Sequence, residues 1–333
     1  MPEPPLIVAV DGGQTATKAL VARADGTVLA AGRGGPSDHF HGPDGIAKNR
    51  RAIHGAIDVA LAAAGAEPAA VAAIGLGLTG APTGGDQQPI VREIVGERLP
   101  AAAVEVLPDY RTNLAGASGG APGVVVIAGG GAIGYGLTAD GREALAGGYG
   151  YLLGDEGSAF DIGLRAIAAA CRADDRRGGP TALLEAVCAH FAVPEVRQIT
   201  RVVYRDGFSR ERISLLAPAV VAAAAAGDAV AARILAGAAA DLADTALGVV
   251  RQLFAPGDPV AVYPTGGVFA AGPPILGPFK AALAAGWPAA EVRAPRFPPA
   301  VGALIAARRL LGLPADEAWL ATVGATLPAA GTL

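Results

Sequence analysis

Short apolar runs alternate along the chain with longer segments in which apolar residues recur at helical spacing. Leu6–Val10, Val71–Leu78 and Val124–Ala128 have the length and composition of buried strands. Ile46–Ala64 and Asp228–Phe254 instead carry the periodicity of helices with one buried face. Because strands that alternate with helices usually form parallel sheets covered by helices, the pattern predicts an α/β fold.

The same criteria predict the remaining elements. Further strands are expected at Thr17–Arg23, Thr27–Arg33, Val104–Leu107, Ile133–Thr138, Arg142–Gly147 and Val260–Pro264. Further helices are expected at Gln88–Leu99, Ser158–Arg172, Thr181–Phe191, Ile213–Ala226 and Pro299–Leu311.

Two regions of the chain follow one plan, which reads strand, glycine-rich turn, strand, hairpin, strand. The tetrapeptides Arg23–Gly26 and Thr138–Gly141 both end in Ala-Asp-Gly and stand at the hairpin of each copy. An Asp-Gly pair between two strand-like runs is a strong hairpin signal. The repeated order of turn and hairpin indicates an internal duplication, with a boundary in the small-residue stretch Ser118–Gly123.

Composition narrows the functional classes. The 333 residues include 30 acidic and 26 basic side chains without a basic stripe, which argues against a nucleic-acid partner. The uncharged stretches Thr112–Ala139 and Pro259–Phe279 are interrupted by Gly or Pro, so no membrane span is expected. Met1–Pro5 lacks the basic and apolar regions of a signal peptide, and a cytoplasmic protein is predicted.

Cysteine and histidine indicate no metal or redox centre. Cys171 and Cys188 are the only cysteines, and reduced, buried thiols are their expected state. The four histidines form no metal-binding spacing with them.

The first glycine-rich turn has the composition of a phosphate site. Asp11 ends a predicted strand and is followed by Gly12, Gly13, Gln14 and Thr15. Backbone N–H groups of such a turn can face phosphate oxygens, and the threonine hydroxyl adds a donor. A carboxylate does not approach phosphate alone, so Asp11 implies Mg²⁺, which is bound through carboxylates, waters and phosphates. A glycine-rich hairpin capped by Asp11 is the alternative.

Gly129, Gly130 and Gly131 form the corresponding turn of the second copy. Three successive glycines cost stability through lost backbone entropy, and close approach to a ligand is a reason to accept that cost. A tight β-turn is the alternative.

Asp109 follows the predicted strand Val104–Leu107, at the strand end where ligands gather in α/β sheets. Two roles remain open for it. It is either the N-cap of the next helix or a base that takes a proton from a sugar hydroxyl.

Three further glycine-rich segments are candidates for ligand contact. Gly147–Gly150 and Gly154–Ser158 flank the entry to a long predicted helix. Asp155 and Glu156 in the latter would either favour the helix N-terminus or bind adjacent sugar hydroxyls. Thr265–Val268 follows a predicted strand and would let an adenine lie against bare backbone.

Together these motifs resemble the N-acetylglucosamine kinase branch of the BadF/BadG/BcrA/BcrD ATPase family, within the actin-like and hexokinase-like superfamily. The resemblance runs from Asp11 to the helix Pro299–Leu311. Its most specific part is Gly147–Ser158, where the family reads G-G-W-G, four residues, then D-E-G-S, and Tyr149 replaces the tryptophan.

The resemblance implies a duplicated, two-lobed actin-like ATPase (ribonuclease H-like) fold with a central cleft. Residues 1–118, joined by the helix 299–312, would form the N-terminal lobe, and residues 119–298 the C-terminal lobe. Asp109 would activate the 6-hydroxyl of the sugar, and Asp11 would organise Mg²⁺ and its water shell. The resemblance assigns the triphosphate to Gly12, Gly13, Thr15, Gly129, Gly130 and Gly131, the sugar to Gly148, Tyr149, Gly150 and Asp155, and the nucleoside to Gly266 and Gly267.

The chain departs from the family pattern at both phosphate turns. Gln14 replaces the third glycine of the first turn. The second turn usually reads G-T-G-S, so Gly130 and Ala132 stand where the family has hydroxyl side chains. Because a hydrogen bond to a charged group contributes about 1.5–3 kcal/mol, weaker ATP binding or slower transfer is expected.

A third departure concerns the sugar. Asp38 and His39 are predicted sugar ligands, and Asp38 stands where the family typically has asparagine. A carboxylate could accept a charge-assisted bond from a free 2-ammonium group, which favours glucosamine over N-acetylglucosamine as acceptor. Alternatively, Asp38 binds a sugar hydroxyl or caps a turn.

The predicted function is ATP-dependent phosphorylation of an amino sugar, N-acetylglucosamine or glucosamine, in a protein that the resemblance suggests is a homodimer. A non-catalytic sugar or nucleotide sensor on the same fold is the first alternative. The second is an ATP-dependent activator of an electron-transfer enzyme, which would need cluster-binding cysteines, whereas Cys171 and Cys188 lie in predicted helices.

Overall fold

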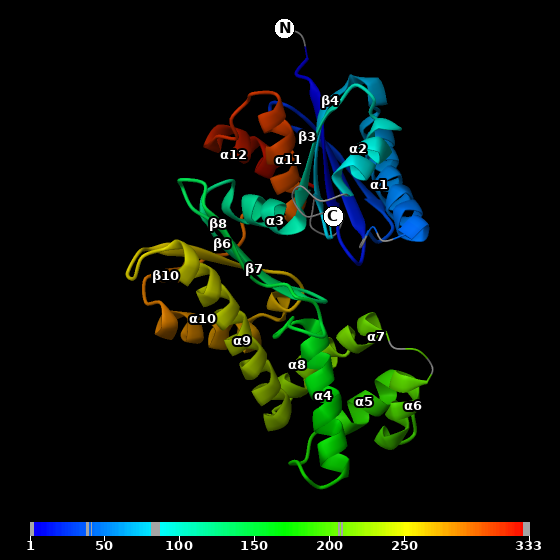
Figure 1. The fold of residues 1–333 in the computed structure, drawn as a ribbon, viewed down its shortest axis with the longest axis vertical. Coiled ribbons are helices and arrows are strands. Elements are labelled where there is room, and N and C mark those ends of the chain that lie inside the picture. Colours follow the sequence, from blue (N-terminus) through cyan, green and yellow to red (C-terminus); the bar gives the residue numbers. More distant parts are fainter. Residues whose placement is uncertain are drawn as a thin grey trace. The chain divides into compact units, whose positions relative to one another are not determined.

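The computed structural model describes residues 3–37, 40, 42–80, 87–205, 207 and 209–328, without the side chains of residues 42 and 43 (Figure 1). The chain divides into two compact units. Unit 1 consists of Met1–Ala121 and Ala294–Leu333, and unit 2 consists of Pro122–Arg293. From the sequence, the C-terminal lobe was expected to begin after residue 118 and to end at residue 298. In the structure, unit 2 begins after residue 121 and ends at residue 293.

Unit 1 is built on a five-stranded sheet. Its strands are β1 (Leu6–Gly12), β2 (Thr17–Arg23), β3 (Val28–Gly34), β4 (Val71–Leu78) and β5 (Ala103–Pro108). The order is β3-β2-β1-β4-β5, in which β1, β2 and β3 are antiparallel and β4 and β5 run parallel to β1. The carboxyl ends of β1, β4 and β5 therefore meet at one edge.

Helices cover both faces of this sheet (Figure 1). They are α1 (Gly42–Ala64), η1 (Pro68–Ala70), α2 (Gln87–Gly96), α3 (Asp109–Ser118), α11 (Pro299–Leu310) and α12 (Glu317–Thr326). Val8 and Val10 of β1 join the core under α1 and α2, whereas Ile7 and Ala9 join the core under α11 and α12. The two-residue period of a strand thus fills two cores, which explains why β1 is continuously apolar from Leu6 to Val10, ahead of Asp11.

Glycines let α11 pack backbone to backbone against α3. A Cβ on Gly302 would meet the carbonyl oxygen of Thr112 and lie 2.8 Å from the nitrogen of Gly116. A Cβ on Gly116 would lie 2.6 Å from the carbonyl oxygen of Pro298. The close crossing fixes α3, whose first residue is Asp109, against the segment that returns from unit 2.

Unit 2 repeats the topology of unit 1. Its strands are β6 (Gly123–Ala128), β7 (Ala132–Leu137), β8 (Glu143–Gly147), β9 (Val260–Thr265) and β10 (Ala290–Val292). Their order is β10-β9-β6-β7-β8, with β6, β7 and β8 antiparallel and β9 and β10 parallel to β6. The order β8-β7-β6-β9-β10 in unit 2 therefore matches the order β3-β2-β1-β4-β5 in unit 1, strand for strand and with the same relative directions.

The two hairpins also share their hydrogen bonds. Arg23 N–H donates to Thr27 O at 2.9 Å in unit 1, and Thr138 N–H donates to Arg142 O at 3.0 Å in unit 2. The glycines that follow aspartate, Gly26 and Gly141, have φ of 103° and 85°. The predicted duplication and the α/β fold class are confirmed.

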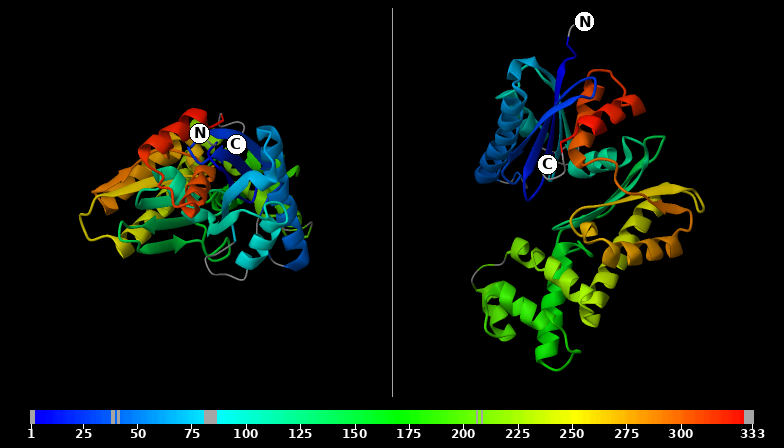
Figure 2. Two further views of the ribbon diagram at one scale, coloured as in Figure 1. Left: turned by 90° about the horizontal axis from the view of Figure 1, so that it is seen from above. Right: turned by 180° about the vertical axis from the view of Figure 1, so that it is seen from behind.

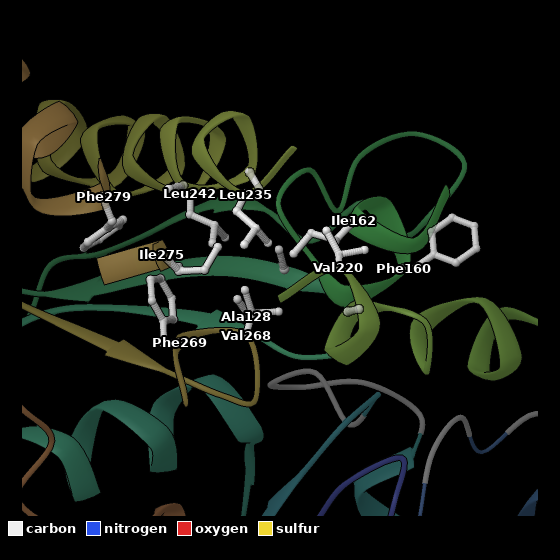
Figure 3. Close-up of a cluster of buried hydrophobic side chains, with 14 of the residues drawn as sticks. Ala128, Phe160, Ile162, Val220, Leu235, Leu242, Val268, Phe269, Ile275 and Phe279 are labelled. Carbon is white, nitrogen blue, oxygen red and sulfur yellow. The ribbon is translucent and has the colours of Figure 1, made fainter. Parts of the chain in front are cut away.

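Unit 2 carries more helix than unit 1. Its helices are α4 (Ala159–Asp174), α5 (Leu183–Phe191), η2 (Val196–Gln198), α6 (Ile199–Tyr204), α7 (Arg210–Ser214), α8 (Ala217–Ala225), α9 (Ala229–Leu253), η3 (Phe269–Ala271) and α10 (Pro273–Gly286). Figure 2 shows α4 to α8, in green, gathered beyond the end of the sheet. Leu235 and Leu242 of α9 share one core with Ala128 of β6, Ile162 of α4 and Ile275 of α10 (Figure 3).

Some elements differ from the prediction. The single helix expected at Ile213–Ala226 is two helices, α7 and α8, because the chain turns at Leu215–Leu216 and Pro218 starts a new helix near its N-terminus. No element was assigned from the sequence to Pro273–Gly286, which forms α10 with Pro278 inside it. No helix in the described part of the chain is long and apolar enough to cross a bilayer.

Candidate active site

The first glycine-rich turn joins β1 to β2. Gly13 N–H donates to Ala16 O at 3.1 Å, which closes the turn and leaves Gln14 and Thr15 exposed at its tip. A Cβ on Gly13 would find nothing nearer than Ala16 O at 3.7 Å, so the backbone there is open to a ligand.

Gly12 has a different reason to be glycine. A Cβ at this residue would lie 2.5 Å from Leu78 Cδ2 and 3.0 Å from Ser37 Oγ. Its missing side chain therefore makes room for neighbouring protein rather than for a ligand. The Gly12 carbonyl accepts from both the backbone N–H and the hydroxyl of Thr79, at 3.1 Å and 3.2 Å.

Asp109 begins α3 directly after β5. The N-cap of α3 is Pro108, so Asp109 does not hold the capping position that the sequence left open for it. Thr79 Oγ1 donates to Asp109 Oδ2 at 2.6 Å. Burial raises the pKa of the Asp109 carboxyl, while Thr79 and the backbone N–H groups of Tyr110 and Asp109 oppose the rise.

Asp11 lies in β1 opposite Lys18 of β2. Burial raises the pKa of Asp11 to about 6, Lys18 opposes the rise, and the negative charge of Asp109 adds to it. The two carboxylates are thus close enough to interact unfavourably. Because carboxylate pairs attract a divalent cation, this donor set fits Mg²⁺ that also binds phosphate.

Thr79 is a residue that the motifs did not reveal. It follows β4 and connects the Gly12 carbonyl of the first turn to the Asp109 carboxylate. A threonine after an apolar strand has no distinctive spacing, so only the adjacency of β1, β4 and β5 identifies it.

Backbone hydrogen bonds gather the candidate segments of unit 2 around the second glycine-rich turn. Ala128 O accepts from Val268 N–H at 3.0 Å, and Gly129 O accepts from Ala159 N–H at 2.8 Å. Ala132 O accepts from Gly148 N–H at 3.1 Å. The loop after β9, the N-terminus of α4 and the loop after β8 are therefore all tied to this turn.

The glycines of unit 2 serve different purposes. Gly148 and Gly150 have φ of 74° and 83°, and Gly266 has φ of 95°, so these loops need glycine for their backbone conformation. Gly129 has no atom within 4 Å of a Cβ built on it, and its face is open. Gly131 instead leaves room for two side chains, Asp155 and Arg210.

Asp155 lies at the second turn and is only 4% exposed. Its Oδ1 accepts from Ala132 N–H at 3.1 Å, and its Oδ2 accepts from Arg210 Nη2 at 2.8 Å. Burial raises the pKa of Asp155, the Ala132 N–H and Arg210 lower it, and Glu156 raises it. Asp155 also has φ of 62°, a strained conformation for a residue with a side chain, which its two partners hold in place.

The remaining predicted sugar ligands differ in what the structure says of them. Tyr149 is 74% exposed in the loop after β8. Asp38 and His39 lie outside the described residues. Ser37, directly before them, donates its backbone N–H to Gly13 O at 2.9 Å and its hydroxyl to Asn49 at 2.5 Å. Ser37 therefore lies beside the first glycine-rich turn.

The family model of the BadF/BadG/BcrA/BcrD ATPase family matches residues 8–307. The chain belongs to this family. The match covers both units, from β1 to α11, and the family resemblance noted in the sequence is confirmed.

Named relatives point to the same branch. An N-acetylmuramic acid/N-acetylglucosamine kinase of Clostridium acetobutylicum is 29% identical over 307 residues, which are 91% of this chain and 98% of the relative. The structure of a candidate N-acetylglucosamine kinase from Chromobacterium violaceum is 31% identical, covers 91% of this chain and 99% of its own, and has a TM-score of 0.73. The predicted class of enzyme, an ATP-dependent sugar kinase, agrees with these names.

A third similarity concerns the fold. A ROK family glucokinase from Streptomyces griseus, solved with glucose and AMPPNP, has a TM-score of 0.58 at 20% identity and covers 91% of this chain and 99% of its own. At this identity the comparison supports a common two-lobed architecture.

Proposed function

We propose that the protein transfers the γ-phosphoryl group of ATP to the 6-hydroxyl of an amino sugar, with Asp109 as general base. The observation that carries the proposal is the carboxylate pair of unit 1. Asp109 is oriented by Thr79, and Asp11 lies close enough to respond to its charge. The names of the relatives support the substrate class.

Asp109 has the properties of a base for this reaction. It takes the proton of the sugar hydroxyl on a carboxylate oxygen, while the hydroxyl oxygen forms a bond to the γ-phosphorus and the bond to ADP breaks. The raised pKa of Asp109 brings the carboxyl nearer to the operating pH, which favours proton transfer. Positioning and charge neutralisation, rather than covalent help, are the main demands of phosphoryl transfer.

Asp11 would hold Mg²⁺, directly or through water. Bound Mg²⁺ neutralises the charge on the phosphate oxygens. The open backbone at Gly13 and the Thr15 hydroxyl would serve the phosphates from unit 1. The cation would also relieve the repulsion between Asp11 and Asp109.

Unit 2 would bind the rest of ATP and part of the sugar. The open face of Gly129, with Gly130 and Gly131, would receive the phosphates. The loop at Gly266 and Gly267 would receive the nucleoside on the open side of Gly267, since a Cβ on Gly266 would meet the backbone of Ala128. The hydrogen bond from Val268 to Ala128 supports this assignment, because it ties the two segments together. Gly148, Tyr149, Gly150 and Asp155 would contact the sugar.

Asp38 would decide between amino sugars. Its carboxylate suits a free 2-ammonium group, so glucosamine is the proposed acceptor, with N-acetylglucosamine as the alternative that the relatives' names favour. An Asp38→Asn variant should shift the ratio of kcat/KM for the two sugars toward N-acetylglucosamine. An unchanged ratio would remove Asp38 from the explanation of specificity.

The test of the kinase function is ADP release with Mg-ATP and a panel of neutral, amino, N-acetylated and carboxylated hexoses. Sugar-dependent release is expected for at least one amino sugar, and Asp109→Asn should abolish it. Asp244→Asn, which changes an exposed carboxylate of α9, should leave it unchanged. ATP binding without any sugar-dependent release would favour a sensor, for which the missing hydroxyls at Gly130 and Ala132 would be the explanation.

A further inference from the structure

Arg210 lies against the second glycine-rich turn. A Cβ built on Gly131 would lie 2.6 Å from Arg210 Nη2, the nitrogen that donates to Asp155. The guanidinium also lies over the Tyr151 ring, with its carbon 5.5 Å from the ring centroid. Contact with a carboxylate, a ring and a glycine turn holds the cation in one place.

The packing of α7 on α4 brings Arg210 to this place. A Cβ on Gly163 of α4 would meet the carbonyl oxygen of Ile213, so glycine allows the two backbones to touch. The Ile213 side chain is buried, and Ser209 caps α7 by accepting from Arg212 N–H at 3.1 Å. Arg210 is the first residue of α7 and is therefore positioned by the core of unit 2.

Among the residues that the structure describes, few acceptors face the hydrogen-bond donors of Arg210. A guanidinium has five N–H donors, and within the described ranges only Asp155 accepts from it. Its Nε is buried and has no partner in that part of the chain. The Arg210 side chain is 23% exposed, so guanidinium donors other than the buried Nε can reach a ligand with several acceptor oxygens.

The adjacent turn lacks donors of its own beyond the backbone. Gly130 and Ala132 have no hydroxyl, and Gly131 has no side chain to block the guanidinium. The turn that would be weakest toward phosphate is thus the turn beside which an arginine is held.

We propose that Arg210 binds a phosphate oxygen of ATP at the second turn and replaces the hydroxyl donors that Gly130 and Ala132 lack. The inference rests on the proposed kinase function for its ligand. A planar guanidinium matches the geometry of phosphate oxygens, and Asp155 orients it through the 2.8 Å hydrogen bond. Gly131 is glycine because this arrangement needs the space of its side chain.

Equilibrium binding of Mg-ATP, Mg-ADP and adenosine to the full chain tests the inference without requiring turnover. Arg210→Gln should weaken Mg-ATP binding about 10- to 100-fold and leave adenosine binding unchanged. Arg210→Lys, which keeps a charge without the planar fork, should lose less. Arg212→Gln is the matched control, since Arg212 lies on the same helix but donates to Phe191 O and should bind ATP as the parent does.

A second variant covers the case in which Arg210→Gln fails to fold because Asp155 is left buried and unpaired. The double variant Asp155→Asn/Arg210→Gln removes both charges, and asparagine tolerates the φ of residue 155. It should fold, bind adenosine normally and show the same loss for Mg-ATP. Unchanged Mg-ATP binding in either variant would overturn the inference.

The sugar provides the other possible anion. If Arg210 instead binds a carboxylate on the acceptor, Arg210→Gln should raise KM only for a carboxylated hexose and leave Mg-ATP binding intact, which would overturn the phosphate assignment. Failure of the proposed kinase function can be told apart from failure of this inference. A protein without sugar-dependent ADP release would still bind Mg-ATP more weakly after Arg210→Gln if Arg210 contacts a phosphate.

Discussion

Replacing Thr79 with valine removes one hydrogen bond to the proposed base and keeps the shape of the side chain. Thr79 Oγ1 lies 2.6 Å from Asp109 Oδ2 and 3.2 Å from Gly12 O, and it has a single hydrogen to give. The shorter contact goes to the carboxylate when Asp109 is ionised. The backbone bond from Thr79 to Gly12 O, at 3.1 Å, does not depend on the side chain.

The size and sign of the effect follow from this bond. A hydrogen bond to a charged group contributes about 1.5–3 kcal/mol, and one pKa unit corresponds to about 1.4 kcal/mol. Thr79 favours the charged form of Asp109, so its removal should raise the pKa of Asp109 by about one to two units. Because the base acts in its ionised form, the acidic limb of the rate profile should move to higher pH by the same amount.

The assay is kcat/KM for the sugar from about pH 5 to about pH 9 at saturating Mg-ATP. Thr79→Ser retains a hydroxyl and should keep the parent midpoint. Thr322→Val removes an exposed hydroxyl that donates to Ala318 O in its own helix, and it serves as the matched control. A Thr79→Val profile with the parent midpoint and a uniformly lower rate would refute the reasoning, because Thr79 would then act on structure and not on the ionisation of Asp109.

Two further predictions concern stability. Asp11→Asn should leave the unfolding free energy unchanged near pH 4 and raise it by up to about 3 kcal/mol above pH 6. The reason is that the pKa of Asp11 rises from 3.8 to about 6 on folding, so the parent loses stability as this group ionises. Equal melting temperatures of parent and variant at high pH would contradict this prediction. Gly302→Ala should lower the unfolding free energy by about 1–3 kcal/mol, because its Cβ would meet Thr112 O. Gly96→Ala in α2 should not lower it, because no atom lies within 4 Å of the new Cβ. Thermal melts of both variants measure the difference.

The fold could be predicted from the sequence where local signals agree. β4 occupies the predicted range Val71–Leu78 because a buried strand is a continuous apolar run. β2 occupies the predicted range Thr17–Arg23, in which a shorter apolar run lies between Lys18 and Arg23. The hairpins at Gly26 and Gly141 were predictable because Asp-Gly specifies a turn with positive φ. By contrast, α10 contains Pro278, a residue that argues against a helix unless tertiary packing overrides it.

The site could be predicted only where its residues stand in motifs. Thr79 and Arg210 belong to no motif, and their partners, Asp109 and Asp155, lie 30 and 55 positions away in the sequence. Such pairs follow from which strands are neighbours and from where α7 packs. The sequence also does not show why each glycine is needed. Gly12 and Gly13 are adjacent, yet neighbouring side chains fill the space beside Gly12, whereas Gly13 has open space beside it.

The duplication provides an internal test of whether Asp109 is structural. In the chain, α3 follows β5, the last strand of the unit 1 sheet, and α11 follows β10, the last strand of the unit 2 sheet, although α11 itself belongs to unit 1. Both helices begin after a proline N-cap, Pro108 and Pro298. The first residue is Asp109 in α3 and Pro299 in α11. Both residues suit the first position of a helix. An acid is therefore not required to start this helix, and the carboxylate of Asp109 remains available for chemistry.

The same comparison applies to Asp11. Counted from the matching hairpins, Asp11 and Lys18 of unit 1 correspond to Ile127 and Ile133 of unit 2, which are likewise cross-strand partners. Two isoleucines fill this pair of positions in one sheet without any charge, so the fold does not need a charged pair there. Because burial makes the carboxylate of Asp11 unfavourable in the other sheet, its presence is best explained by a ligand that a carboxylate binds and an isoleucine cannot. A divalent cation carried in with ATP meets that requirement.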